Sequence, residues 1–383
     1  MSQAADSMRF ELERFYSELS TQMRLIGAEE MGRRYVVVRM ARMEANGHLD
    51  YSALQRILGR VTDLRSWPGV WSQEAAKWEA AADQASSEGR QASAMDGYLH
   101  ASACHHWGQY LARFGSAERV EGRTKRVVLY RRAIDCRAER IEPLSIPYLG
   151  QHLPGYLHLP AVSAGSLPAC VVMVAGADST KEEYHNWARQ FVRRGLAVLT
   201  FDGPGQGELV GVLPMRPEAW HEPMAAVLDA LESSGKIDGS RIAAWGSSMG
   251  GFLVSCAVAR DRRFRAAVSL GGFYDFRDYP FWPLTTQLNV MEDLMIDVVA
   301  EARDYVAQRC SLSGLASQIR CPYLVIHGAR DELVTVAEAK QMAAEAHDGE
   351  FVCFHDGFHT CTNYNLELVP LMSDWLAAKL GKD

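Results

Sequence analysis

The chain has 383 residues, of which 48% are hydrophobic and 23% are charged, so it can form one large domain and a smaller one. Its formal net charge of −7 argues against nucleic acid as the main partner. The basic stretch RTKRVVLYRR is interrupted by apolar residues, and we interpret it as the solvated face of a helix.

No targeting or membrane segment is expected. The N-terminal stretch MSQAADSMRFELERF mixes both signs of charge and lacks an apolar core, so we expect no secretory signal. The longest apolar stretch, near Ala169–Ala177, is about half as long as a membrane span requires.

Eight cysteines are scattered along the chain without any C-x-x-C pair. This pattern favours buried thiols in a reducing cytoplasm, and neither a disulfide framework nor a zinc site. The cysteines are Cys104, Cys136, Cys170, Cys256, Cys310, Cys321, Cys353 and Cys361.

The N-terminal part of the chain has helical periodicity. Apolar residues recur at helical spacing up to about Cys136, beginning with Phe10 and Phe15, and we predict an all-helical domain over residues 1–138. The tract SWPGVWSQE contains a Pro-Gly pair and a good helix-capping residue, Ser72. We interpret this tract as a link between two helices.

Residues 139–383 are predicted to form a second domain, in which apolar strands alternate with amphipathic helices. The strands are ACVVMVA, LAVLTFD, RIAAWG, AAVSLGG, CPYLVIHG and EFVCFH. This alternation predicts an α/β fold with a mostly parallel sheet and helices on both faces. Functional residues of such sheets lie in loops at the carboxyl ends of the strands. The long segment at about residues 276–316 is predicted to add helices over the mouth of the sheet.

Two adjacent serines stand in the segment WGSSMGG, and the glycine spacing distinguishes them. Ser248 has Gly246 two residues before it and Gly250 two residues after it, whereas Ser247 has no such glycines. In a strand that turns abruptly into a helix, the backbone approaches its neighbours so closely that a Cβ would clash. We therefore predict Ser248 at the apex of the turn. The alternative is an ordinary strand-to-helix turn with a capping serine.

A serine nucleophile needs a base within hydrogen-bond reach. The stretch FHDGFHT follows the strand EFVCF, which places His359 in a loop just past the last strand and His355 within that strand or at its end. The two histidines could also suggest metal ligation, but Gly357 between them argues against the helix that an H-x-x-x-H site requires.

The acid that orients this histidine is expected after the preceding strand. The stretch HGARDELV supplies Asp331 there, and Glu332 and Asp356 are weaker candidates. The order Ser248, Asp331, His359, each after its own strand, is the chain order of α/β-hydrolases. In this arrangement the serine attacks, the histidine takes and returns its proton, and the aspartate fixes the imidazole tautomer.

Two backbone amides are candidates for stabilising the oxyanion of a tetrahedral intermediate. One is the amide of Met249, at the start of the helix that follows Ser248. The second should follow the strand ACVVMVA, which makes the amide of Ala177 or Gly176 the candidate.

The glycine-rich stretch FDGPGQGE superficially suggests a nucleotide site. Its glycines are spaced G-x-G-x-G, so the third glycine of G-x-G-x-x-G is missing and no G-K-[ST] follows. We predict a tight loop beneath the mouth of the active site and expect no cofactor.

The ordered motifs GADSTKEEY, FDGPGQGE, WGSSMGG, HGARDELV and GFH resemble those of one family of α/β-hydrolases. This family is typified by the 2,6-dihydroxypseudooxynicotine hydrolases of nicotine breakdown. It also includes FrsA-like esterases and fungal hydrolases that shorten polyketide pigment precursors. The resemblance extends from about Arg140 to the end of the chain, and more loosely over GYLHASACHHWGQYLARFG in the helical part.

This resemblance implies an α/β-hydrolase domain with an N-terminal helical cap over the active site, in a protein that is often a homodimer. It places Ser248, Asp331 and His359 in the catalytic triad, and the amides of Ala177 and Met249 in the oxyanion hole. No metal or organic cofactor is needed.

The substrate pocket is predicted less directly. Asp178 lies on a family motif, and Tyr98, His105 and Trp107 belong to a helix that could line the pocket. The alternative for these three helix residues is ordinary packing of one cap helix on its neighbours.

The family suggests two chemistries. The leading prediction is hydrolysis of a C–C bond in an aryl ketone or β-dicarbonyl of aromatic or polyketide metabolism. The alternatives are a carboxylesterase or thioesterase, a hydrolase-fold cyclase, and a ligand-binding protein whose catalysis has lapsed. Each of these implies a small-molecule partner, and we expect a cytoplasmic protein without membrane attachment.

Overall fold

A computed structural model of the chain divides it into two compact units, Met1–Ile141 and Glu142–Asp383. The residues that it describes are 13–14, 16–21, 24–25, 41–45, 47–161 and 166–381. Phe10 and Phe15, where the predicted helical pattern began, lie outside the described residues, as does most of the stretch considered for a secretory signal.

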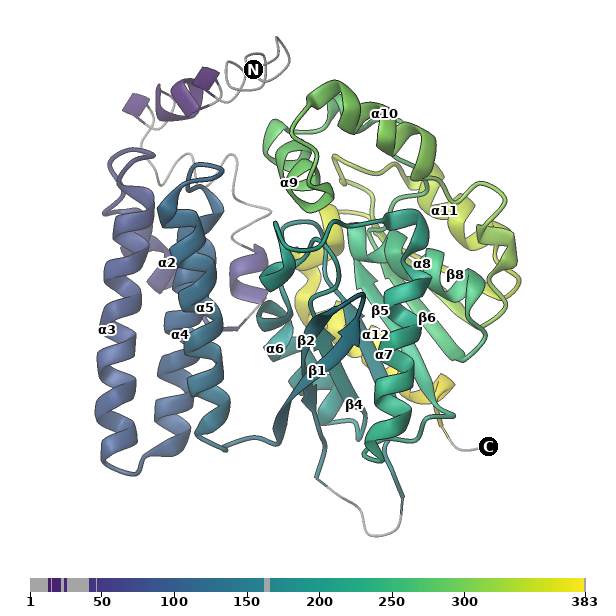
Figure 1. Cartoon of the computed structure of the whole chain (residues 1–383), viewed down its shortest axis with the longest axis horizontal. Helices are drawn as coiled ribbons and strands as arrows, with labels where there is room; N and C mark the ends of the chain where they lie inside the picture. Colours follow the sequence, from purple (N-terminus) through teal and green to yellow (C-terminus); the bar gives the residue numbers. More distant parts are fainter. Residues whose placement is uncertain are drawn as a thin grey trace. The chain divides into compact units, whose positions relative to one another are not determined.

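The first unit is helical in the part that the structure describes before Ile141. Its main helices are α2 (Tyr51–Leu58), α3 (Trp67–Ser87), α4 (Gln91–Tyr110) and α5 (Ala117–Asp135), and the last three pack side by side (Figure 1). The large side chains of Trp71 and Trp107 are almost completely buried in this unit.

Two local predictions for this unit are corrected by the structure. The tract SWPGVWSQE is not a link, because α3 begins at Trp67 and Ser72 lies inside it. Proline is tolerated in the first turn of a helix, where its missing N–H has no intrahelical partner to lose, and Pro68 occupies that turn. The basic stretch lies in α5 as predicted, but its Arg126 is buried and does not belong to a solvated face.

The second unit is built on an eight-stranded sheet with the order β1-β2-β4-β3-β5-β6-β7-β8. Neighbouring strands from β4 to β8 run parallel, and β2 runs antiparallel to β4. The mostly parallel sheet is therefore confirmed. The strands are β1 (Ile141–Tyr148), β2 (Gln151–His158), β3 (Cys170–Val174), β4 (Ala197–Phe201), β5 (Ile242–Ser247), β6 (Phe264–Leu270), β7 (Tyr323–Gly328) and β8 (Gly349–Phe354).

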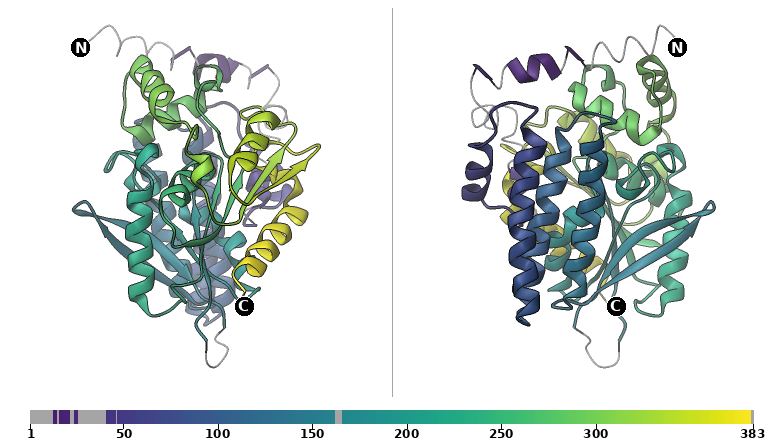
Figure 2. Two further views of the ribbon diagram at one scale, coloured as in Figure 1. Left: turned by 90° about the vertical axis from the view of Figure 1, so that its right-hand side faces the viewer. Right: turned by 60° about the vertical axis from the view of Figure 1, so that its left-hand side comes forward.

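Helices cover both faces of this sheet, as the alternating pattern predicted. Helices α6 and α12 pack together on one face, and α7 and α8 pack together on the other (Figures 1 and 2). Every residue of β3, β4 and β5 is buried, because central parallel strands are covered on both sides. The helices are α6 (His185–Val192), α7 (His221–Ser234), α8 (Met249–Arg260), α11 (Val336–Glu345) and α12 (Asn365–Lys379).

The long segment after β6 contains two further helices, α9 (Leu284–Leu294) and α10 (Val299–Arg309). Among the described residues, no helix combines the length and the apolar character that crossing a membrane requires. All eight cysteines are free thiols. Cys353 is exposed, so the interpretation of buried thiols is wrong for this residue, which lies on β8 at the edge of the sheet.

Candidate active site

The turn between β5 and α8 presents Ser248 at its apex. Ser248 has φ 56° and ψ −124°, a backbone conformation that non-glycine residues rarely adopt and that is often found at functional sites. Its amide donates to the carbonyl of Leu270 over 2.8 Å, which ties the turn to the end of β6. Ser247 is the last residue of β5, and its buried hydroxyl bonds to that of Tyr184 at 2.7 Å.

The glycines on either side of Ser248 are required by close backbone contacts. A Cβ on Gly246 would lie 2.1 Å from the carbonyl oxygen of Gly250. A Cβ on Gly250 would lie 2.2 Å from the carbonyl oxygen of Val174, at the end of β3. These contacts explain the G-x-S-x-G spacing and assign the apex to the second serine of the pair.

His359 lies between Ser248 and Asp331 in one continuous hydrogen-bonded chain. Its Nε2 lies 2.8 Å from Ser248 Oγ, and its Nδ1 lies 2.7 Å from Asp331 Oδ2. His359 opens a short 3₁₀ segment just past β8, and the next two residues, Thr360 and Cys361, both have positive φ. The structure thus brings together three side chains that the sequence separates by up to 111 positions.

The side chain of Asp331 is fully buried and is held by the backbone as well as by the imidazole. Its Oδ1 accepts hydrogen bonds from the amides of Leu333 and Val334, at 2.8 and 3.1 Å. Burial alone would raise the pKa of Asp331, but the charge and hydrogen bond of His359 and the Leu333 amide outweigh it, so the pKa lies below its ordinary value. This carboxylate therefore remains ionised and can fix the tautomer of the imidazole.

Two glycines allow the loops after β7 and β8 to meet. A Cβ on Gly328 would lie 2.3 Å from the carbonyl oxygen of Gly357, which also accepts the amide of Arg330 at 2.9 Å. The weaker acid candidate Asp356 pairs instead with the guanidinium of Arg330 at 2.6 Å. His355 is almost fully exposed and lies just past the end of β8.

Of the two oxyanion candidates, Met249 follows the nucleophile directly in the chain, whereas Ala177 belongs to a loop that lies beside it in space. Met249 is the first residue of α8, so its amide belongs to the first turn, which has no intrahelical acceptor. A Cβ on Gly176 would lie 3.2 Å from the carbonyl oxygen of Ser247 and 3.3 Å from Ser248 Cβ. The loop after β3, which carries Ala177, therefore lies directly beside the turn.

Three of the predicted pocket residues, Tyr98, His105 and Trp107, belong to α4 of the first unit. The hydroxyl of Tyr98 bonds to Asp83 and to Arg132 of the same unit, each at 2.7 Å. Burial lowers the pKa of His105 to about 4, and Trp107 is almost completely buried. These contacts are those of a packed helix, and the pocket role of the three residues stays a prediction.

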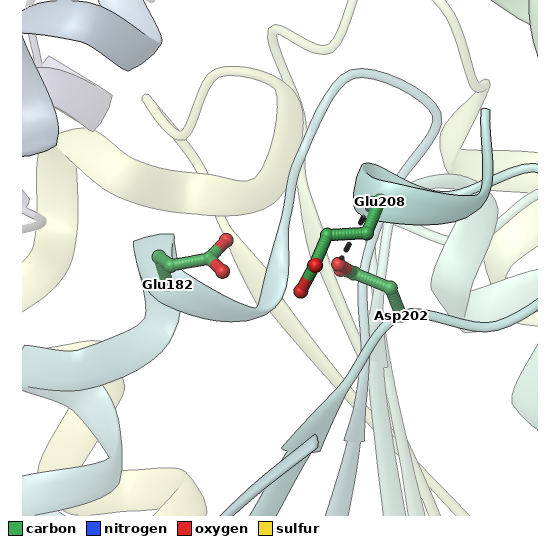
Figure 3. Close-up of side chains that lie close together, drawn as sticks. All are labelled: Glu182, Asp202 and Glu208. Atoms are coloured by element: carbon green, nitrogen blue, oxygen red, sulfur yellow. Dashed lines mark hydrogen bonds between the residues drawn. The ribbon is translucent and has the colours of Figure 1, made fainter. Parts of the chain in front are cut away.

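The loop after β3 continues past the half-buried Asp178 to a buried lysine. Lys181 Nζ lies 2.7 Å from a carboxylate oxygen of Glu182, 2.6 Å from Asp202 and 2.7 Å from Glu208. Figure 3 shows the three carboxylates converging from three segments of the chain. Carboxylates in this arrangement could hold a metal ion, but the lysine ammonium already supplies a cation to all three.

The pKa of Lys181 reflects this environment. Burial alone would lower the pKa of this lysine, but the charges of Asp202 and Glu182 outweigh it and raise the pKa well above its ordinary value. Lys181 is therefore charged throughout the working pH range.

The glycine-rich stretch FDGPGQGE forms the tight loop that its spacing predicted, and it wraps around Asp202. A Cβ on Gly207, which has φ 49°, would lie 2.0 Å from Asp202 Oδ2. A Cβ on Gly205, with φ 75°, would lie 2.4 Å from the carbonyl oxygen of Asp293. The glycines are thus explained by close packing inside the protein.

Sequence reasoning gave no role to Lys181, Asp202, Gln206 or Tyr184. In the stretch KEEY, Lys181 stands beside two glutamates, and a lysine in such a charged stretch is usually solvent-exposed. The one available signal was Asp202, which directly follows the buried strand β4 and therefore lies at the functional end of the sheet.

Family models and relatives agree with this architecture. The model of the Prolyl oligopeptidase family matches residues 218–383, and that of the X-Pro dipeptidyl-peptidase (S15 family) matches residues 150–283. The chain is 30% identical over 315 residues to the 2,6-dihydropseudooxynicotine hydrolase of Paenarthrobacter nicotinovorans, covering 81% of this chain and 84% of that protein.

Fungal proteins match over a shorter part. The chain is 32% identical over 255 residues to the alpha/beta hydrolase xenA of Xenoacremonium sinensis, covering 63% of this chain and 59% of xenA. It is 35% identical over 240 residues to the alpha/beta hydrolase psoB of Aspergillus fumigatus, covering 57% of this chain and 52% of psoB. The matches thus span little more than half the length of these two relatives.

Solved structures show the same fold. The crystal structure of the 2,6-dihydroxy-pseudo-oxynicotine hydrolase aligns with a TM-score of 0.82 at 27% identity, covering 89% of this chain and 95% of that one. The structure of AbyA5 aligns with a TM-score of 0.70 at 20% identity, covering 90% of this chain and 100% of that one, which shows a shared fold.

Proposed function

Because the chain belongs to the α/β-hydrolase family of the 2,6-dihydropseudooxynicotine hydrolase, we propose that it hydrolyses a carbonyl compound through Ser248, His359 and Asp331. The observation that carries the proposal is the hydrogen-bonded chain from Ser248 Oγ through both ring nitrogens of His359 to Asp331, with distances of 2.8 and 2.7 Å. The strained backbone of Ser248 supports it, because strain of this kind is retained where it serves a function.

The proposed mechanism uses the same groups in both half-reactions. His359 Nε2 accepts the proton of Ser248 as its Oγ attacks the carbonyl carbon, and the Asp331 carboxylate stabilises the imidazolium that forms. The amides of Ala177 and Met249 donate to the oxyanion. His359 then protonates the leaving group, and water hydrolyses the acyl-enzyme by the same proton transfers.

The leaving group distinguishes the candidate chemistries. We favour cleavage of a C–C bond in an aryl ketone or β-dicarbonyl, in which the departing carbon is stabilised as an electron-rich aryl group or an enolate. The match to the 2,6-dihydropseudooxynicotine hydrolase over 84% of that protein supports this choice. A carboxylesterase, a thioesterase or a hydrolase-fold cyclase would use the same residues with a different leaving group or nucleophile.

The test compares turnover of a β-diketone with that of a p-nitrophenyl ester, using the wild-type chain and the Ser248→Ala variant. C–C hydrolysis predicts that the diketone is cleaved with the larger kcat/KM and that Ser248→Ala abolishes cleavage. A larger kcat/KM for the ester would assign the chain to the esterases. Tight binding of carbonyl ligands without turnover of either substrate would favour a binding protein.

The assembly and location of the chain are part of the same proposal. By the family resemblance, the helical unit acts as a cap that excludes water, and the protein is a homodimer that acts on a small molecule. The free thiols support a reducing cytoplasm. Light scattering of the purified protein tests the dimer, which predicts twice the mass of one chain.

A further inference from the structure

We propose that the glycine-rich loop of residues 202–208 positions the oxyanion donor of Ala177, with Gln206, Lys181 and Tyr184 as positioning residues. This inference rests on the proposed function, since it assigns a role to groups around the amide that would bind the oxyanion. It also gives a purpose to a motif whose glycine spacing differs from that of a nucleotide site.

Gln206 bridges the glycine-rich loop and the loop after β3. Its Nε2 donates to the carbonyl of Ala175 over 2.7 Å, and its Oε1 accepts the amide of Gly203 at 3.1 Å. The Gln206 side chain is almost completely buried, so water cannot replace it in these bonds. Ala175 lies two residues before Ala177. Gln206 therefore fixes the start of the loop of residues 175–181, which we call the oxyanion loop.

Lys181 fixes the same loop four residues after Ala177. Its backbone amide donates to Asp202 Oδ1 over 3.0 Å, and its Nζ donates to Asp202 Oδ2 over 2.6 Å. The side chains of Asp202 and Lys181 are both fully buried. The attraction between opposite charges is stronger in such surroundings than in water. Figure 3 shows the side chains of Glu182 and Glu208 near that of Asp202.

Between the attachments at Ala175 and Lys181 the chain is short, and a backbone hydrogen bond restricts one of its peptide planes. The Ser179 amide donates to the carbonyl of Gly176 at 3.3 Å. In a trans peptide the C=O and the following N–H point in opposite directions, so this bond also restricts the direction of the Ala177 N–H.

Tyr184 sets the distance between the oxyanion loop and the nucleophile. Its hydroxyl bonds to Ser247 Oγ at 2.7 Å, directly before Ser248 in the chain. Its ring packs edge-on against Trp245, with centroids 5.3 Å apart, so the hydroxyl is held in place from the β5 side as well. The oxyanion loop and the residues up to Tyr184 that follow it are thus attached at the ends of β4 and β5, the two strands that flank β3.

The expected size of the effect follows from the geometry of catalysis. Removing one oxyanion donor lowers rates by about 10²–10³-fold, and small displacements of such a donor lose part of this stabilisation. Substitution of a positioning residue should therefore slow the attack of Ser248 on a carbonyl carbon, or on the phosphorus of a phosphonate, without removing the nucleophile.

The test measures the second-order rate constant for inactivation of the full chain by a fluorophosphonate, which reacts with the serine and needs the same oxyanion donors. We expect Gln206→Leu to slow inactivation on the order of tenfold to a hundredfold, and Tyr184→Phe to slow it about threefold to tenfold. The inhibition constant of an aryl boronate, a mimic of the tetrahedral intermediate, should rise by similar factors.

Two matched controls separate positioning from general loss of packing. Gln287→Leu removes a buried glutamine whose Nε2 donates to the carbonyl of Trp282 at 2.8 Å. Tyr323→Phe removes a buried hydroxyl that bonds to Ser255 Oγ at 2.6 Å. Both variants should be inactivated within about twofold of the wild-type rate, because the hydrogen bonds that they lose join residues outside the loop that carries Ala177. Thermal unfolding of every variant verifies that it is folded.

Two outcomes overturn the inference while leaving the proposed function intact. One is wild-type inactivation rates in folded Gln206→Leu and Tyr184→Phe, and the other is an equal slowing in the matched controls. If Gln206→Leu does not fold, Tyr184→Phe decides by itself. Failure of the wild-type chain to react at Ser248 would instead overturn the proposed function, and the positioning role with it.

Discussion

Two glycine-rich turns lie on either side of the loop that follows β3, and they differ in what they present. The turn from the end of β5 into α8, residues 246–250, presents Ser248 to the imidazole of His359. The turn after β4, residues 202–208, folds inward around Asp202 and its ion pair with Lys181. Both need glycine because other backbone or side-chain atoms lie where a Cβ would be. Glycine spacing therefore indicates close approach, whereas the chemistry depends on the side chain that the turn carries.

The largest expected effect separates the two serines of the first turn. Ser248→Ala should lower the rate of substrate turnover at least about a thousandfold, and by more than any other single change, because it removes the nucleophile. Ser247→Ala should cost no more than about threefold to tenfold, the loss expected for Tyr184→Phe, since its hydroxyl bonds to Tyr184 and not to His359. Steady-state kinetics of both variants check this, and comparable damage from both would contradict the assignment of the apex.

A second prediction compares two buried carboxylates, Asp331 beside His359 and Asp202 in the ion pair with Lys181. Asp331→Asn should lower kcat on the order of 10³–10⁴-fold in a folded protein, because the amide supports the wrong tautomer of His359. Asp202→Asn should lower the free energy of unfolding by about 3 kcal/mol, because it leaves the buried Lys181 short of a partner.

Denaturant unfolding and turnover rates, measured on both variants, test this contrast. An Asp202→Asn protein as stable as the wild type would show that the ion pair contributes nothing. An Asp331→Asn protein with wild-type kcat would remove the acid from the proposed mechanism.

A third prediction concerns the glycines themselves. Gly250→Ala and Gly207→Ala should each destabilise the fold by more than about 3 kcal/mol, because the added Cβ meets Val174 in one case and Asp202 in the other. Gly235→Ala is the control: this residue has φ 63° but open space around it, so only about 1 kcal/mol of backbone strain is expected. Chemical denaturation measures all three, and equal losses at the three positions would contradict the role of close contact.

The smallest expected effect is a difference in pH dependence. The pKa of Asp331 is lowered on folding, so its stabilisation is present above the ordinary value of 3.8 and is lost as pH falls below it. The pKa of Lys181 is raised, so its stabilisation is present below the ordinary value of 10.5 and is lost as pH rises above it.

Unfolding free energies across the pH range check these two windows. Asp331→Asn should flatten the acid decline below pH 3.8, and Asp202→Asn should flatten the alkaline decline above pH 10.5. The assigned pKa directions would be contradicted if Asp331→Asn flattened the alkaline decline and Asp202→Asn flattened the acid decline.

The sequence predicted what depends on local spacing and on strand ends. The G-x-S-x-G pattern placed Ser248 at a turn, and the residues just past β7 and β8 indicated Asp331 and His359, because parallel strands bring their carboxyl ends to one edge. The buried ion pair of Lys181 and Asp202 depends on how two loops meet across the sheet, and nothing in the spacing of KEEY shows that meeting. Ser72 was misplaced because proline can open a helix as well as end one.

The central claim is that Ser248 is the nucleophile, and the measurement that tests it most directly is peptide mapping after incubation with a fluorophosphonate. We predict one adduct, on Ser248, in the wild-type chain and in Ser247→Ala, and no adduct in Ser248→Ala. A wild-type chain that stays unmodified, or an adduct on Ser247, would contradict the claim.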